Sequence, residues 1–230
     1  MKYKHIFFDL DRTLWDFEEN SNETLLELCN KYNIASRGIS DHNEFITKYK
    51  LHNEHLWALY RENKISQKKL RSQRFYNTLL DYGIDDFKLS EKIGLDYIEI
   101  CPKKTKLFPY VLEALNYLKN KYYLHIITNG FEKTQLIKLK CSALMPFFLN
   151  IITSEKIGFK KPSPKIFEYA LQKSQAIKSE SIYVGDDLEV DILGCQNFGI
   201  DGIFFNPQKT PHKEKVTYEI SSLSQLLEIF

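Results

Sequence analysis

Long apolar runs are missing from this 230-residue chain, and their absence argues against a protein that spans a membrane. The longest one, near MPFFLNII, is far shorter than the roughly 20 residues that a transmembrane helix needs. The first run, in MKYKHIFFDLD, is too short for a signal peptide and meets acidic residues at once. We therefore expect no membrane partner.

Cysteines are few, and neither sign of charge is in excess. The four cysteines are scattered, with no CxxC pair, so a reduced, cytoplasmic protein is expected. Lysine and arginine total 32 against 30 acidic residues, and no basic arm or aromatic-basic stripe appears. These features exclude a nucleic-acid polymer as the expected partner. We expect a monomer or a weak homo-oligomer.

Short apolar runs of strand length are present, and they predict the fold. The five runs cover residues 6–8, 124–127, 147–152, 182–184 and 203–205. Helical patterns lie between the last four. Strands that alternate with helices predict an α/β fold with a doubly wound, parallel, Rossmann-like sheet.

Residues 16–104 differ from the rest, because they contain helical patterns and no convincing strand. Leucines recur at helical intervals in NETLLELCNKY, and Ser66 is placed to cap a helix that ends near Gly83. We expect a helical bundle inserted after the first strand. The predicted domains are a core of residues 1–15 and 105–230 and an inserted domain of residues 16–104.

Two aspartates, Asp9 and Asp11, follow the first predicted strand directly. A buried carboxylate is costly unless it is paired or bound to a metal, although a solvated turn would also explain the pair. Other polar groups follow the next three predicted strands: Thr128-Asn129-Gly130, then Lys160 and Lys161, then Asp186 and Asp187 with Asp191 beyond. Ligands of open α/β sheets bind beyond the carboxyl ends of the strands, so we expect these groups to converge.

This set of side chains suits phosphoryl transfer with a divalent cation. Mg²⁺ usually takes one or two carboxylates, here Asp9 and Asp186, together with waters and phosphate oxygens. A lysine would offset the charge of the phosphate, and Thr128 would donate to it. A carboxylate can attack phosphorus, and a second can protonate the leaving group. We predict Asp9 as the nucleophile and Asp11 as the acid/base.

The segments FFDLDRTL, ITNG, KKP and GDDLEVD resemble, in order and context, the four motifs of the haloacid dehalogenase superfamily. The helical block resembles the C1-type cap of that superfamily. The resemblance implies the same roles for Asp9 and Asp11, with phosphate bound by the Thr128-Asn129-Gly130 loop and Lys161. It also implies that Mg²⁺ is held by Asp9, Asp186 and the backbone carbonyl of Asp11, with Asp191 as a further acid. Arg12 departs from the pattern, which commonly has a small residue there.

A closer resemblance concerns the substrate. The segments DLDRTLWDF, TNGFEKTQ and SEKIGFKKPSPKIFEYAL are similar to pyrimidine 5'-nucleotidases that act on modified nucleoside monophosphates. This implies a small phosphorylated substrate, a pyrimidine nucleoside 5'-monophosphate. Trp15 and Phe17 are predicted to stack on its base, unless they only pack the cap against the core.

Several alternatives stay open at this point. A sugar phosphatase or a phosphomutase would use the same residues, and a non-enzymatic phosphoacceptor or binding protein has the same fold. A true dehalogenase is disfavoured, because its first motif lacks a second aspartate like Asp11. Asp187 could also have a purely structural role, as the N-cap of the helix that follows it.

Overall fold

The computed structural model describes residues 2–230, which form two compact units. The first unit comprises the described residues up to Phe17 together with Thr105–Phe230, and the second comprises Glu18–Lys104. The cap range expected from the sequence began at residue 16, whereas the second unit begins at Glu18.

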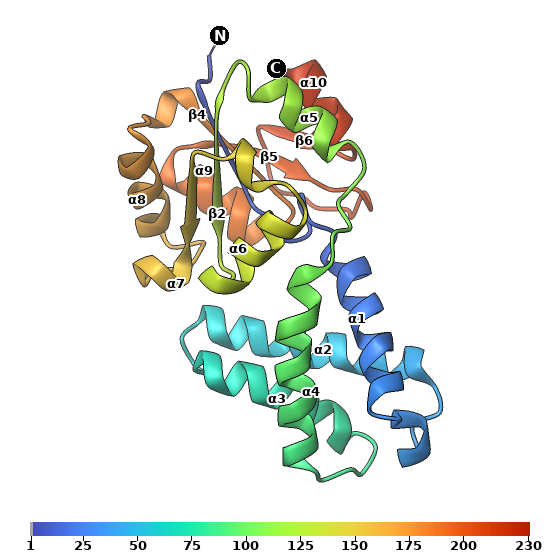
Figure 1. The fold of residues 1–230 in the computed structure, drawn as a ribbon. Coiled ribbons are helices and arrows are strands. Elements are labelled where there is room, and N and C mark those ends of the chain that lie inside the picture. The colour runs from blue at the N-terminus through green and yellow to red at the C-terminus, as the bar shows by residue number, and fades with distance from the viewer. Residues whose placement is uncertain (1) are drawn as a thin grey trace. The chain divides into compact units, whose positions relative to one another are not determined.

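A parallel sheet of six strands forms the centre of the first unit. Its strand order is β3-β2-β1-β4-β5-β6, and every neighbouring pair is parallel. The strands are β1 (His5–Phe8), β2 (Tyr123–Thr128), β3 (Asn150–Thr153), β4 (Ser181–Gly185), β5 (Asp201–Phe205) and β6 (Tyr218–Ile220). The predicted α/β fold with a doubly wound parallel sheet is thus confirmed (Figure 1).

Two details of the sheet differ from the prediction. The third strand begins at Asn150, because Met145–Phe147 forms a 3-10 turn that contains Pro146, a residue without a backbone donor. The edge strand β6 was not predicted. It spans three residues, and the side chains of Tyr218 and Glu219 are exposed, so it lacks an apolar run.

Helices cover both faces of the sheet (Figure 1). Phe7, Ile127 and Tyr183 of the strands share one buried cluster with Phe167 and Cys195. Since side chains alternate along a strand, the neighbours of these strand residues face the opposite layer. The helices of this unit are α5 (Val111–Leu118), α6 (Glu132–Cys141), α7 (Ser154–Ile157), α8 (Pro164–Ser174), α9 (Gly194–Phe198) and α10 (Leu226–Ile229).

The second unit is made of helices. They are α1 (Phe17–Lys31), α2 (His42–Arg61), α3 (Gln67–Leu80) and α4 (Phe87–Ile100), and the 3-10 helix Ile34–Arg37 lies between α1 and α2. Ser66 caps α3 as predicted, because its hydroxyl accepts a hydrogen bond from the Lys69 amide. The rings of Tyr49, Phe75 and Tyr97 pack together in the interior.

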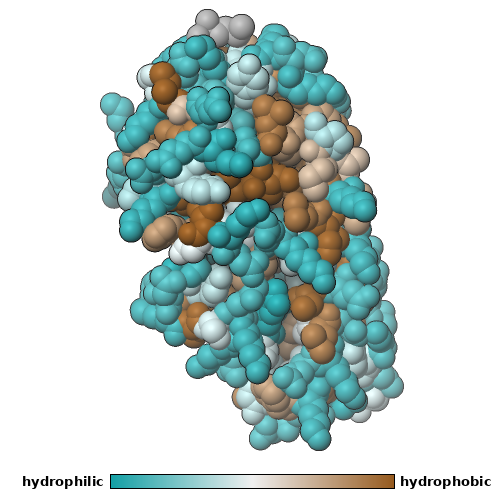
Figure 2. All heavy atoms as spheres, turned by 60° about the vertical axis from the view of Figure 1, so that its left-hand side comes forward, coloured by the Kyte–Doolittle hydropathy of each residue, from teal (hydrophilic) through white to brown (hydrophobic). Residues whose placement is uncertain are grey.

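Polar residues cover most of the molecular face in Figure 2, with apolar residues exposed in groups between them. A helix at the surface of a protein usually buries an apolar side and exposes a polar one. Among residues 2–230, none of the helices has the length and hydropathy that crossing a bilayer demands.

A buried histidine pair lies in the first two strands. His125 Nε2 is 3.1 Å from His5 Nδ1, and the Asn150 amide donates to His125 Nδ1 over 3.1 Å. The Phe7 ring stacks on the His125 ring. Burial lowers the pKa of His125 from 6.5 to about 3, and His5 contributes to the shift. A proton on Nδ1 would also face the Asn150 donor, so this histidine is neutral in the folded protein.

Neutral His125 predicts a stability that falls in acid. Between pH 6.5 and 3 the unfolded chain binds a proton that the folded protein does not, so falling pH favours unfolding. The stabilisation is complete above pH 6.5 and is lost by about 1.4 kcal/mol per pH unit below it. We expect urea unfolding to show that the free energy of unfolding of the wild type, relative to that of His125→Gln, is about 2 kcal/mol smaller at pH 5 than above pH 6.5. If the free energies of unfolding of the two proteins changed equally with pH, this prediction would be contradicted.

Candidate active site

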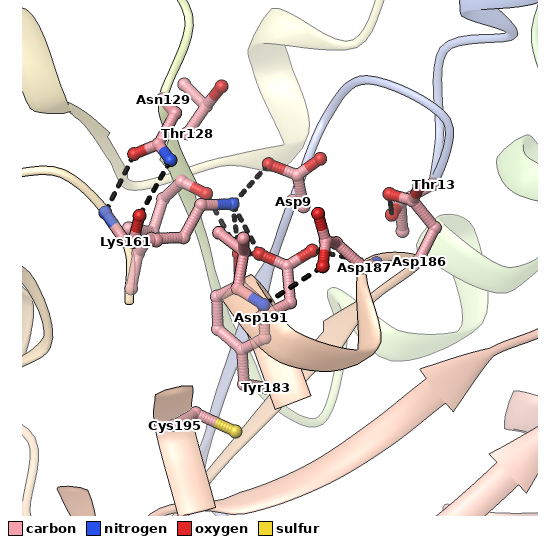
Figure 3. Close-up of polar contacts among 12 residues, drawn as sticks. Asp9, Thr13, Thr128, Asn129, Lys161, Tyr183, Asp186, Asp187, Asp191 and Cys195 are labelled. Carbon is pink, nitrogen blue, oxygen red and sulfur yellow. Dashed lines mark hydrogen bonds and ion pairs between the residues drawn. The ribbon is translucent and has the colours of Figure 1, made fainter. Parts of the chain in front are cut away.

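The carboxyl ends of β1, β2 and β4 bring together the polar residues that the sequence placed after the strands (Figure 3). Asp9 directly follows β1, and its amide donates to the Val184 carbonyl, which extends the ladder by one residue. Thr128 ends β2, and Asp186 follows β4. The expected convergence at one sheet edge is therefore what the structure contains.

Lys161 is the centre of an ion network. Its ammonium lies 2.6 Å from Asp9 Oδ1 and 2.7 Å from Asp191 Oδ1, and it donates to the Tyr183 hydroxyl over 2.8 Å (Figure 3). Of the two lysines after the third strand, Lys161 is thus the one that reaches the aspartates. Burial lowers the pKa of Lys161, but attraction by Asp191 and Asp9 outweighs it and raises the pKa above its ordinary value.

Asn129 fixes the backbone of Lys161. The Asn129 side chain accepts from the Lys161 amide over 2.8 Å and donates to the Lys161 carbonyl over 3.0 Å (Figure 3). Tyr183 of β4 supports the same lysine, because its hydroxyl accepts from Lys161 and donates to the Ile127 carbonyl. The side chain of Asn129 therefore holds the site lysine in this structure.

The three aspartates after β4 have different surroundings. Asp187 is the N-cap of the turn Leu188–Leu193, since its carboxylate accepts from the amides of Glu189 and Val190. The interpretation of Asp187 as a cap is confirmed. Asp186 accepts from the Thr13 hydroxyl over 3.0 Å. Asp191 turns back towards Lys161.

Gly185 makes room for this return. A Cβ at Gly185 would lie 2.4 Å from Asp191 Oδ2, closer than real Cβ contacts come. The close approach therefore requires glycine at the end of β4.

Asp9, Asp186 and Asp191 form a group that could hold a metal ion. One carboxylate oxygen of each lies within 4.8 Å of the others. Burial raises the pKa of Asp9 to about 7, with Lys161 opposing the shift and Asp191 and Asp11 adding to it. Burial and the neighbouring acids raise the pKa of Asp186 as well, and burial raises that of Asp191. Of these three neighbouring carboxylates, the Lys161 ammonium contacts only Asp9 and Asp191, so negative charge remains in excess and the residues fit a bound cation.

Thr128 has an oriented hydroxyl group. Its oxygen accepts from the Gly130 amide over 3.0 Å and from Gln135 Nε2 over 2.7 Å. Both lone pairs of the oxygen are then in use, so the remaining hydroxyl hydrogen is available as a donor. A Cβ on Gly130 would collide with the Gln135 amide, which explains the glycine in this loop.

The Asp11 carboxylate is bound by two side chains of α6. Its Oδ1 accepts from Lys138 Nζ over 2.5 Å, and its Oδ2 accepts from Gln135 Nε2 over 2.9 Å. Asp11 is partly exposed, whereas Lys138 and Gln135 are buried. The group that could hold a metal includes the side chain of Asp9 and not that of Asp11.

The aromatic residues after β1 are placed differently from each other. Trp15 is fully buried, and Lys138 lies over its ring at 4.2 Å. Phe17 is half-buried, and the Arg12 guanidinium lies 4.8 Å from its ring centre. Arg12 has a φ of 65°, in the left-handed region that favours glycine. This conformation gives a physical reason for the small residue that the superfamily commonly has at this position.

Sequence reasoning missed Gln135, Lys138 and Tyr183. Gln135 and Lys138 lie on the buried face of α6, yet they are polar, so that helix has no clean apolar stripe. Their burial could be inferred only once the helix and its facing side were known. Tyr183 was assigned to an apolar strand, and nothing in the sequence marks its hydroxyl.

Known proteins resemble the chain over its full length. The family description haloacid dehalogenase-like hydrolase matches residues 6–205. YfnB of Bacillus subtilis, named as a HAD-hydrolase, is 31% identical over 232 residues, covering 99% of this chain and 95% of YfnB. The pyrimidine 5'-nucleotidase YjjG of Escherichia coli is 30% identical over 232 residues, covering 100% and 98%. The glyceraldehyde 3-phosphate phosphatase of Methanothermobacter thermautotrophicus is 30% identical over 239 residues, covering 98% and 99%.

A solved structure agrees with these matches. The crystal structure of YfnB bound to magnesium has a TM-score of 0.89 with this chain at 30% identity, covering 100% of this chain and 99% of YfnB. The family expected from the four motifs is confirmed. This chain belongs to the haloacid dehalogenase-like hydrolases and is an enzyme of that family.

Proposed function

We propose that the protein is a Mg²⁺-dependent phosphomonoesterase that works through an aspartyl-phosphate on Asp9. The observation that carries the proposal is the buried Asp9 carboxylate, which shares Lys161 with Asp191 at the sheet edge where Thr128 presents a hydroxyl donor. In this arrangement the carboxylate can attack phosphorus. The ammonium can offset the charge of the phosphoryl oxygens, and the hydroxyl can donate a hydrogen bond to them.

In the first step, an Asp9 oxygen attacks phosphorus and the bond from phosphorus to the leaving oxygen breaks. Asp11 gives its proton to that oxygen, which leaves as an alcohol. Lys161 and the hydroxyl of Thr128 hold the phosphoryl oxygens. Asp11 comes from the turn just after Asp9, so both carboxyl groups reach one substrate from the same loop.

In the second step, water attacks the phosphorus of the aspartyl-phosphate. Asp11, now a carboxylate, takes the proton of the water, and the bond between phosphorus and the Asp9 oxygen breaks. Inorganic phosphate leaves, and Asp9 and Asp11 return to their starting forms. Lys161 keeps its contact with Asp191 throughout, so it stays fixed while Asp9 changes its bonding.

We infer that Asp9, Asp186 and Asp191 with their neighbours hold Mg²⁺. A bound divalent cation would offset the charge shared by these carboxylates and the phosphate. The raised pKa values of all three groups support a cation in this place. The magnesium in the YfnB crystal structure supports the same choice.

For the substrate, we propose a pyrimidine nucleoside 5'-monophosphate. The similarity to the nucleotidase YjjG supports this choice, as does the half-buried ring of Phe17 beyond the catalytic turn. Stacking of a base on an aromatic ring contributes roughly 1–3 kcal/mol. Phe17 is the better candidate of the two predicted rings, because Trp15 is fully buried under Lys138. A triose phosphate is the second candidate, supported by the similarity to a glyceraldehyde 3-phosphate phosphatase.

Phosphate release across a substrate panel tests the proposed function. The panel contains thymidine, deoxyuridine, adenosine and guanosine 5'-monophosphates, glyceraldehyde 3-phosphate and hexose phosphates, each with Mg²⁺ and with a chelator. We expect release that needs Mg²⁺ and the highest kcat/KM for the pyrimidine nucleotides. A preference for a triose or hexose phosphate would overturn the nucleotidase assignment, and no release from any ester would overturn the phosphatase.

A further inference from the structure

Asp11 is held by two buried side chains of α6 that the mechanism above does not use. Lys138 and Gln135 are one helical turn apart, so they face the same way, and each binds a different oxygen of the Asp11 carboxylate. A carboxylate accepts about four hydrogen bonds, so one position on each oxygen stays open for the transferred proton. The rotation of Asp11 is therefore fixed without blocking its chemistry.

Lys138 is itself held rigidly. Its side chain is only 6% exposed, and its ammonium lies over the Trp15 ring at 4.2 Å. Among residues 2–230, its one carboxylate partner is Asp11. A buried ammonium pressed between a ring and a carboxylate has a single geometry, so it determines where the Asp11 oxygens lie.

Gln135 links Asp11 to Thr128. Its two amide hydrogens are donated to Asp11 Oδ2 and to Thr128 Oγ1, whereas its own oxygen is buried with no partner. An unpaired buried acceptor is unfavourable and calls for an explanation. Here the side chain satisfies two site residues at the expense of its own oxygen, which favours a role in placing them.

We propose that Lys138 and Gln135 are positioning residues: Lys138 aims Asp11 at the leaving oxygen, and Gln135 aligns Asp11 with the hydroxyl of Thr128. The proposal rests on the phosphatase mechanism above, and neither residue touches the reacting atoms in it. A small misplacement of a catalytic group is enough to lower a rate strongly. Lys138 thus acts on proton transfer, and Gln135 acts on both proton transfer and phosphate binding.

Substrates with different leaving groups separate these roles from mere structural support. A nucleoside 5'-monophosphate needs a proton on its departing alkoxide, whereas 4-nitrophenyl phosphate releases a weakly basic phenolate that needs none. The ratio kcat/KM reports the steps up to departure of this group, so hydrolysis of the aspartyl-phosphate does not enter it. Both substrates use the same phosphoryl site, so a distorted site would slow both.

We expect Lys138→Met to lower kcat/KM for thymidine 5'-monophosphate by about 10- to 100-fold and to leave 4-nitrophenyl phosphate close to wild type. Lys138→Arg, which keeps the charge, should recover much of the loss. Lys140→Met removes an exposed lysine of the same helix and should change neither substrate. Gln135→Met should lower kcat/KM for both substrates, because it also disturbs Thr128. If Lys138→Met does not fold, Lys138→Gln takes its place with the same expected selectivity.

Two results would overturn the inference. One is an equal loss on both substrates in the Lys138 variants, and the other is no loss on the nucleotide. Failure of the wild type to hydrolyse either ester would instead overturn the proposed function, so the two failures are distinguishable.

Discussion

Asp9→Asn should abolish phosphate release, with a loss on the order of 10⁴-fold or more in kcat. An amide is neither a nucleophile towards phosphorus nor a good ligand for a cation, and Asp9 is assigned both roles. The variant should still fold, since asparagine has nearly the same shape and removes a charge whose burial is unfavourable. Because burial raises the pKa of Asp9 from 3.8 to about 7, the metal-free protein loses stability as the pH rises between these two values, and the loss is complete above pH 7.

Three measurements check the Asp9 prediction. Steady-state phosphate release gives the loss in rate, and thermal unfolding shows whether Tm is kept or raised. Intact mass spectrometry after an acid quench should detect a phosphorylated chain in the wild type and none in Asp9→Asn. Phosphorylation of the variant, or turnover near the wild-type rate, would place the nucleophile elsewhere.

Much of the site could be predicted because three of its motif residues lie at the end of a strand or directly after it. Asp9, Thr128 and Asp186 stand at strand ends, where a parallel sheet gathers them regardless of the packing details. The site lysine was harder to assign, because Lys160 and Lys161 are neighbours with the same side chain. The resemblance of KKP to the superfamily motif singled out Lys161, and its contacts with Asp9 and Asp191 agree.

The residues that support the site could not be predicted from the sequence, and the reason is physical. The role of Gln135 depends on which face of α6 is buried, and that depends on tertiary packing more than on local pattern. Arg12 shows the same limit, since its left-handed backbone is set by the turn between Asp11 and Trp15. The edge strand β6 has two exposed residues out of three, so its pairing is fixed by β5 and leaves little mark in the sequence.

Asp186→Ala and Asp187→Ala should change different properties of the protein, although the two residues are neighbours. Asp186 lies in the group that could hold a cation, so its loss should raise the Mg²⁺ concentration needed for half-maximal activity by at least about tenfold. Asp187 caps the turn Leu188–Leu193, so its loss should lower stability by about 1 kcal/mol and leave the Mg²⁺ requirement nearly unchanged.

Thermal unfolding with and without Mg²⁺ separates these effects without relying on turnover. A ligand that binds only the folded protein stabilises it by about 2.7 kcal/mol at a hundredfold excess over Kd. Mg²⁺ should therefore raise the Tm of the wild type and of Asp187→Ala by similar amounts, and that of Asp186→Ala much less. Without Mg²⁺, Asp187→Ala should have the lowest Tm, whereas Asp186→Ala loses a carboxylate that Asp9 and Asp191 repel. Equal shifts of Tm by Mg²⁺ in the two variants would mean that Asp186 is not a ligand, and the cation would then have to be held by Asp9 and Asp191.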